Sequence, residues 1–139
     1  MKVFDSMEIA GSSLTAHRLW LDTISSNLAN INTTRTKAGG PYKRRVPVFA
    51  EMLDNTIGGY HDIGGVRVLS ISEDDSAPRL TYQPDHPDAN EQGYVAYPNV
   101  NLVKEMTDML VASRAYEANL SVVTTGRDMW NGALEVMRG

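Results

Sequence analysis

The residues best suited to chemistry lie in one short run, Asp85-His86-Pro87-Asp88. Carboxylates beside an imidazole are groups that bind a divalent metal ion or relay a proton. A metal site needs three or four converging ligands, however, and the only other histidines are His17 and His61. Pro84 also stiffens the run, and aspartate before proline is typical of turns. We therefore expect no catalytic and no metal-binding residue, and a small metal-dependent hydrolase is kept only as an alternative.

Other signatures of enzymes and cofactor sites are missing from the sequence. It contains no Gly-x-Ser-x-Gly, no phosphate-binding Gly-x-x-x-x-Gly-Lys and no His-Glu-x-x-His. It has no cysteine, which excludes disulfides and thiolate metal sites. The formal net charge of −4 argues against nucleic acid as a partner, because binding phosphates needs a basic surface. We expect a protein that is not an enzyme and that uses no cofactor.

Charged residues are segregated by sign in the middle of the chain. Residues 33–50 contain bases and no acid, whereas acids predominate further on. Opposite patches on one small protein permit head-to-tail docking between copies, which builds rings or filaments rather than closed dimers. We expect the basic cluster of one subunit to meet an acidic segment of its neighbour. The candidate residues are Lys43, Arg44 and Arg45 on the basic side and Asp74, Asp75 and Asp85 on the acidic side.

Apolar residues recur at steps of three, four and seven at both ends of the chain. This spacing places them on one stripe of a helix and is the pattern that drives coiled-coil packing. The stripes predict two long helices that pair with each other, with neighbouring copies, or with both. The predicted seam residues are Met7, Leu14, Leu21, Ile24 and Leu28 near the N-terminus and Leu102, Met106, Met109, Tyr116, Leu120, Val123, Trp130 and Leu134 near the C-terminus.

The first helix is expected over residues 4–31, and the second from a cap at Asn99 or Asn101 to about residue 137. A row of small residues, Ala112, Ala115 and Ala118, has two interpretations. It lets another helix approach closely, or it reflects only the high helix propensity of alanine.

Residues 33–99 differ from both ends, because all six prolines lie among them. Short β-branched runs around residues 46–48, 65–71 and 79–82 predict strands of a small hairpin or meander. The predicted fold is mainly α, with a discontinuous helical domain formed by residues 1–32 and 100–139. Residues 33–99 form the loop and short-strand insertion between its two halves.

No targeting or membrane segment is expected. Asp5 and Glu8 interrupt the first ten residues, so the start does not read as a cleaved signal peptide. No apolar run approaches the roughly 18 residues that span a bilayer. A dedicated export route that reads an uncleaved N-terminus is compatible with this pattern.

Several short segments of the sequence resemble one protein family. Residues 8–14, EIAGSSL, and residues 26–34, SNLANINTT, resemble the N-terminal signature of bacterial flagellar rod and hook proteins. Residues 86–100, HPDANEQGYVAYPNV, and residues 112–119, ASRAYEAN, are similar to one rod member of that family, found in the proximal part of the shaft. The resemblance covers the chain in the right order, and its signature residues are Asn27, Asn30, Asn32 and Thr33.

The resemblance implies a structural subunit of the flagellar basal-body rod, the shaft that crosses the periplasm. Such a subunit polymerises with its own copies and with other rod proteins into a helical tube that transmits torque and encloses the export channel. It passes through the flagellar export apparatus without a cleaved signal. A sibling rod protein at another position is the nearest alternative. The alternative of a generic coiled-coil adaptor accounts for the two helices but not for the segments that resemble the family.

Overall fold

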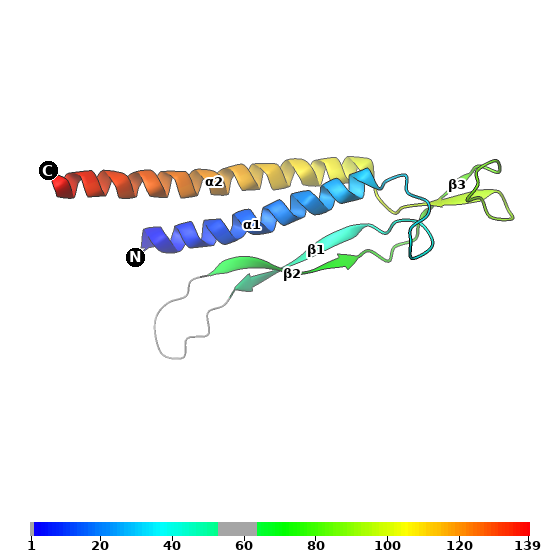
Figure 1. Ribbon diagram of the computed structural model, residues 1–139, viewed down its shortest axis with the longest axis horizontal. Coiled ribbons are helices and arrows are strands. Elements are labelled where there is room, and N and C mark those ends of the chain that lie inside the picture. Colours follow the sequence, from blue (N-terminus) through cyan, green and yellow to red (C-terminus); the bar gives the residue numbers. More distant parts are fainter. Residues whose placement is uncertain (1, 53–63) are drawn as a thin grey trace.

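The computed structural model describes residues 2–52 and 64–139. Residue 1 and residues 53–63 lie outside the described residues. The second of these stretches belongs to the predicted insertion and includes His61. Two long terminal helices flank two short antiparallel hairpins in chain order, and about half of the chain is helical (Figure 1). The elements are α1 (Lys2–Ala29), β1 (Arg45–Met52), β2 (Gly65–Glu73), β3 (Arg79–Tyr82), β4 (Tyr94–Tyr97) and α2 (Leu102–Arg138). The predicted pair of terminal helices around short strands is confirmed.

Helix α1 ends where asparagine and threonine side chains replace the helical hydrogen bonds. The Asn30 side-chain amide donates to the Ser26 carbonyl at 2.9 Å, which satisfies one of the last free carbonyls of the helix. The Thr33 hydroxyl donates to the Asn30 side chain at 3.1 Å, and its amide donates to the Asn30 carbonyl at 3.0 Å. Helix α1 therefore ends at Ala29, two residues before the predicted end at Ile31.

Helix α2 begins at the second of the two predicted caps. The Asn101 side chain accepts a hydrogen bond from the Lys104 amide at 3.1 Å, which is the geometry of an N-cap. Asn99, the other candidate, does not cap the helix. Its side chain instead bonds the backbone of Arg44.

The two hairpins are separate, so the alternative of a single meander is wrong. Strands β1 and β2 pair antiparallel, with a register shift between Val48 and Phe49 that marks a bulge. Strands β3 and β4 form a second two-stranded sheet. The sequence patterns do not predict strand β4.

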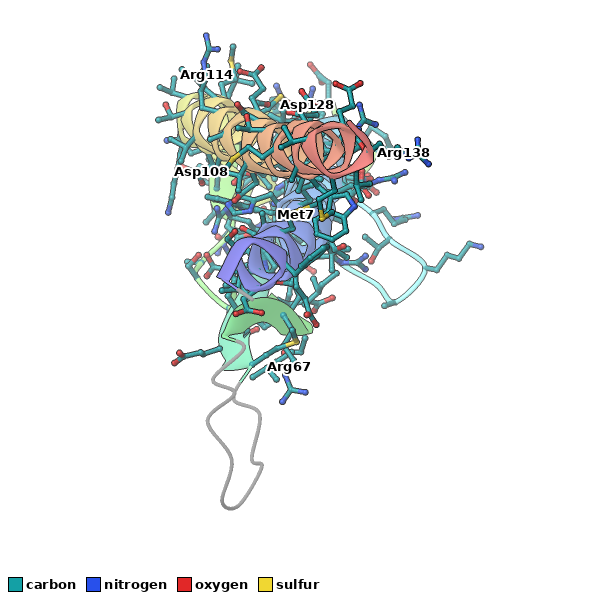
Figure 2. All side chains as sticks on the ribbon, turned by 90° about the vertical axis from the view of Figure 1, so that its left-hand side faces the viewer. Met7, Arg67, Asp108, Arg114, Asp128 and Arg138 are labelled. Carbon is teal, nitrogen blue, oxygen red and sulfur yellow. The ribbon has the colours of Figure 1, made fainter. Side chains whose placement is uncertain are left out.

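The molecule is stacked in layers with α1 in the middle. Helix α2 runs antiparallel along one side of α1, and the β1–β2 hairpin lies against the opposite side (Figures 1 and 2). Figure 2 shows Met7 between the two helices, and Arg67 on the hairpin directed away from them. The core is thin, and α1 supplies more of its buried side chains than any other element. They include Ala10, Ala16, Thr23, Ile24 and Asn27.

Candidate functional site

A buried asparagine joins the two ends of the chain. The Asn27 side chain is 1% exposed and uses its full hydrogen-bonding capacity. Its amide donates to the Arg45 carbonyl at 2.8 Å and to the Glu105 carboxylate at 3.1 Å. Its oxygen accepts from the Tyr42 hydroxyl at 3.0 Å and from the Arg45 amide at 2.9 Å. Asn27 on α1 therefore fixes the start of β1 and the first turn of α2 at once.

A second hub is the guanidinium of Arg44, whose side chain is only 11% exposed. Its Nε donates to Glu105, which is fully buried, and one terminal nitrogen lies 3.4 Å from Asp108. The other terminal nitrogen lies 3.9 Å from Asp74 at the end of the first hairpin. A buried carboxylate is tolerated only with such pairing, because an uncompensated buried charge costs several kcal/mol, roughly 3–5.

The Arg44 backbone is held as firmly as its side chain. Its amide donates to the Asn99 side chain at 2.9 Å. The Asn99 amide in turn donates to the Asp74 carbonyl at 2.9 Å and to the Ser76 hydroxyl at 2.8 Å. Hydrogen bonds from Ser76, chiefly from its backbone amide, lower the pKa of the Asp74 carboxyl. These contacts tie the segment after β2 to the segment before α2.

We call the residues whose side chains make the contacts described above the polar network. It joins α1, the start of β1, the end of β2 and the first turn of α2, and among the described residues it leaves no buried side-chain N or O atom without a partner. Fully satisfied buried polar groups specify one arrangement of the elements around them. The members of the polar network are Asn27, Tyr42, Arg44, Asp74, Asn99, Glu105 and Asp108.

Two of the three residues of the predicted basic cluster, Lys43 and Arg44, pair with acids of the same chain. Lys43 lies 2.8 Å from Asp75, and hydrogen bonding to that carboxylate raises the pKa of Lys43. Arg44 belongs to the polar network, and the Arg45 guanidinium lies 5.7 Å from the ring centre of Tyr42. The β1–β2 register explains the pairing within one chain, because it sets Arg45 opposite Glu73. A contact from this cluster to the acids of a neighbour, including the exposed Asp85, stays a prediction.

The signature asparagines have different roles. Asn27 is a buried hub, and Asn30 with Thr33 ends α1, as described above. Asn32 is exposed and lines a groove at this end of the molecule. Only Asn27 reaches α2 through an observed hydrogen bond.

The run from Asp85 to Asp88 forms a turn and no metal cluster. The Asp88 carboxylate accepts from the Thr34 hydroxyl at 2.8 Å and pairs with Arg35 at 2.9 Å. The Asp88 amide donates to His86 Nδ1 at 3.1 Å, which occupies that ring nitrogen. Within residues 2–52 and 64–139, no three His, Cys, Asp or Glu residues are grouped so as to hold a metal ion.

The contact between the helices uses small and polar residues of α2 more than large apolar ones. Glu105, Ala112 and Gly126 are its buried residues, spaced by multiples of seven. A Cβ atom on Gly126 would lie 2.8 Å from Met7 Cγ and Sδ, so glycine permits this close approach. At the far end, the rings of Phe4 and Trp130 pack edge to face at 4.9 Å. The buried role of Ala112 favours close approach over helix propensity alone for part of the alanine row.

On α2, the contact with α1 uses a stripe that differs in part from the predicted seam, and packing of that seam against neighbouring copies stays a prediction. Ile24 is buried and Met7 contacts the opposite helix, whereas five predicted members are exposed in the single chain. One of the five, Trp130, still packs against Phe4 of α1. The buried stripe passes through Glu105 and Ala112 because two contacts with α1 fix the rotation of α2 about its own axis. These are the hydrogen bond of Asn27 to Glu105 and the close approach of Met7 to Gly126. The exposed members are Leu102 (51%), Met106 (58%), Leu120 (45%), Trp130 (38%) and Leu134 (37%). The half-buried members are Leu14, Leu21, Leu28, Met109, Tyr116 and Val123.

A second apolar line runs along α2 on a different side from the buried stripe. Its residues follow one another at steps of seven and four, so they share one side of the helix. All five are exposed, with Val136 at 83% and Met129 at 61%. We call these residues the outer line, namely Val111, Ala118, Val122, Met129 and Val136. No helix in the described part of the chain is both long and apolar enough to cross a membrane.

Sequence reasoning missed Glu105, Tyr42 and Gly126. The spacing of seven between Glu105, Ala112 and Asn119 carries the signal for the buried stripe, but a seam search that counts only apolar residues passes over it. Asn119 confirms this stripe, since its amide donates to the Ser13 hydroxyl of α1 at 3.0 Å.

Comparison with known proteins agrees with the architecture. Residues 7–37 match the family described as "Flagella basal body rod protein", and residues 91–136 match "Flagellar basal body rod FlgEFG protein C-terminal". The two matched segments contain most of α1 and most of α2.

Full-length relatives point to one rod protein in particular. The chain is 46% identical over its whole length to the complete flagellar basal-body rod protein FlgC of Borreliella burgdorferi. It is 40% identical to FlgC of Bacillus subtilis, with 98% of this chain and 99% of the relative aligned. It is 38% identical to FlgC of Salmonella typhimurium, with 93% of each chain aligned. This protein belongs to the FlgC family of flagellar basal-body rod proteins.

Proposed function

We propose that this chain, a structural subunit of the flagellar basal-body rod and not an enzyme, polymerises with copies of itself and with other rod proteins. The product is a helical tube that transmits torque and encloses the export channel. The observation that carries this proposal is the apolar surface that α2 leaves uncovered.

The uncovered surface of α2 is large for a single chain. Besides the outer line, it includes Val103 at 73% exposure, Leu110 at 60% and Met137 at 72%. Monomeric soluble proteins rarely expose contiguous apolar patches beyond a few hundred Å², so extended apolar surface indicates an interaction site. Helices of neighbouring subunits are the partners that would bury both sides of α2 along its length.

The polar network supports the mechanical part of the proposal. Torque must pass from one part of the subunit to another without the elements sliding past each other. Arg44 and Asn27 join both helices to the first hairpin through buried, fully paired groups, which fixes one register. Each subunit would then act as a stiff unit within the tube.

The chain also divides into two parts by role. Residues 1–32 and 100–139 would supply coiled-coil-like helix packing in the inner layer of the tube, and residues 33–99 the outer contacts. The exposed apolar side chains of the first hairpin, such as Val48 and Leu69, support an outer contact role. The subunit would reach the periplasm-spanning rod through the flagellar export apparatus, with its N-terminus uncleaved.

A charge on the outer line tests the assembly surface. Val122→Glu should fold normally, because Val122 is 46% exposed in the single chain. It should abolish swimming in a strain that lacks the native gene, because assembly would bury an unpaired carboxylate at a cost of several kcal/mol. The matched control is Ser121→Glu, next to it on the exposed surface. Normal swimming with Val122→Glu, at unchanged helicity of the purified protein, would contradict the proposal.

A further inference from the structure

One dipeptide of α2, Asn131-Gly132, has a chemical reactivity of its own. The backbone nitrogen that follows an asparagine can attack the side-chain amide carbon of that asparagine and expel ammonia. A side chain on the following residue hinders the attack, so glycine, which has none, favours it most. Asn131 is the only asparagine of the sequence that precedes a glycine.

Both residues of this dipeptide are open to solvent in the single chain. Asn131 and Gly132 are exposed, and a Cβ atom on Gly132 would have no neighbour within 4 Å apart from the backbone of its own helix. Within the part of the chain that the structure describes, no hydrogen bond engages the Asn131 side chain. Asn119 of the same helix is the contrasting case, because its amide donates to Ser13 Oγ at 3.0 Å and to the Ala115 carbonyl at 2.8 Å. The Asn131 amide is therefore free to react, whereas the Asn119 amide is held.

The helical backbone controls when this reaction can occur. In α2 the Gly132 amide is directed along the helix axis toward the carbonyl four residues earlier, at Asp128. An amide nitrogen in this geometry cannot reach the side chain of the residue before it. Asn131 can therefore react only while the last turns of α2 are open.

The last turns of α2 are the part of the helix that opens most easily. Gly126 is its last buried residue, and residues 127–138 are all exposed. The ring contact of Trp130 with Phe4 of α1 comes before the dipeptide in the chain. Gly132 itself weakens the helix, since glycine is among the least favourable residues in a helix interior. Turns with few buried contacts open locally without unfolding of the whole chain.

We propose that Asn131 of the free subunit deamidates spontaneously, at a rate set by opening of the last turns of α2. In the open turn, the Gly132 nitrogen gives up its proton and forms a bond to Asn131 Cγ. The bond from Cγ to the side-chain nitrogen breaks, and that nitrogen leaves as ammonia. Water then opens the resulting succinimide at either carbonyl, which gives aspartate or isoaspartate. The net change is one water consumed and one ammonia released, so no oxidant, reductant or enzyme is required.

The product loosens the same turns that controlled its formation. An aspartate at position 131 lies three residues after Asp128 and four before Glu135, so like charges meet on one side of the helix. An isoaspartate places an additional carbon in the backbone, which interrupts the helical hydrogen-bond pattern. In the proposed tube, neighbouring subunits would cover these turns and keep them closed. With that step, which rests on the proposed function, deamidation marks the copies that have stayed unassembled.

Peptide mass spectrometry of the purified full chain tests the reaction. The chain is incubated in mildly alkaline buffer, either folded or unfolded in urea, and the loss of each asparagine is followed with time. We expect the unfolded chain to convert Asn131 fastest, and the folded chain to convert it more slowly but clearly faster than Asn119. The proposal is overturned if the folded chain converts Asn131 no faster than Asn119.

Two substitutions at Val136 test control by the helix, because they leave the reacting dipeptide unchanged. Val136 is 83% exposed, so neither variant removes a buried contact. Val136→Gly weakens the last turns relative to Val136→Ala, and the folded Gly variant should convert Asn131 about fivefold faster than the folded Ala variant. In urea the two variants should react at the same rate. Equal rates in the folded chains would show that opening of the helix does not control the reaction.

Basal bodies incubated beside the free chain test protection by assembly. Asn131 should persist longer in the assembled rods than in the free folded chain. Equal conversion in both would overturn the protection. The proposed polymerisation would stand in that case if rods form and remain sensitive to Val122→Glu, so the two failures are distinguishable.

Discussion

The Asn27 amide donates a 3.1 Å hydrogen bond to the Glu105 carboxylate, across 78 residues of sequence. Both side chains are almost completely buried, at 1% and 0% exposure. This bond links the last turns of α1 to the first turn of α2, so it holds the two ends of the chain in register.

Replacing Asn27 should destabilise the fold strongly. Asn27→Ala removes four hydrogen bonds, so the Arg45 amide loses its acceptor and the Tyr42 hydroxyl keeps only its 3.4 Å contact with Ser26. Each buried unsatisfied group costs about 1–3 kcal/mol, so we expect a loss of about 2–4 kcal/mol in the free energy of unfolding measured with urea. Asn32→Ala, at an exposed asparagine of the same signature, is the control and should cost less than about 0.5 kcal/mol. Equal costs for both variants would contradict the hub role of Asn27.

Removing one partner of the buried ion pair should cost more than removing both. Arg44→Met leaves the Glu105 carboxylate buried without a cation and should cost about 3–5 kcal/mol. The double variant with Glu105→Leu should recover part of this loss, since two apolar side chains need no pairing, although the buried Asn27 amide loses its acceptor. Urea unfolding of the native chain, the two single variants Arg44→Met and Glu105→Leu, and the double variant gives the coupling energy. Additive losses in the double variant would show that the two residues are not coupled.

Two glycines in the helices should respond in opposite ways to alanine. A Cβ atom on Gly11 would have no neighbouring atom within 4 Å, so Gly11→Ala should stabilise by up to about 1 kcal/mol through helix propensity. Gly126→Ala places its Cβ 2.8 Å from Met7 Cγ and should gain less or destabilise. Thermal unfolding of both variants measures the difference. A gain at Gly126 as large as at Gly11 would mean that the helices are not in close contact there.

Stability should fall in acid partly through Asp74. Hydrogen bonds from Ser76 lower the pKa of this carboxyl in the folded chain below its unfolded value, which is about 3.9. The stabilisation is therefore complete above the unfolded pKa and is lost as the pH falls through the folded pKa. Asp74→Asn should be less stable than the native chain at pH 6, and the gap should narrow by pH 3. A gap that stays constant between these pH values in urea titrations would assign the effect to something other than ionisation.

Hydrogen exchange should divide α2 into two regions. In the dilute monomer, amides near Glu105 and Ala112 should be protected by the buried contact with α1. Amides of residues 132–138 should exchange fast, because these turns are exposed in the single chain, and they should become protected on assembly. Mass spectrometry of exchanged peptides distinguishes the regions. Full protection of residues 132–138 in the monomer would contradict the need for a partner.

The sequence predicts the helices well because their apolar residues recur over many turns. It locates their ends within a few residues, through Asn30 and Asn101. It misses strand β4, since four residues, Tyr94–Tyr97, show too little alternation to stand out from a loop. That strand forms because β3 pairs with it, which is a tertiary contact.

The site is harder to predict than the fold. The spacing of large apolar residues favours Met106 and Leu120 for the helix contact, whereas the folded chain buries Glu105 and Ala112. Small side chains allow closer approach, and the buried Glu105 is stable only because Arg44 and Asn27 reach it from other elements. Spacing along a single helix carries no information about such partners. Family resemblance singles out Asn27, but its hydrogen bonds are evident only in the structure.

The most direct test of the central claim is electron microscopy of basal bodies from a strain that lacks this gene, beside the same strain restored with the intact chain. We predict that rods and hooks disappear in the deletion strain and return on restoration, because a tube cannot continue past a missing subunit. Normal rods and hooks in the deletion strain would contradict the claim that this chain is a structural part of the shaft.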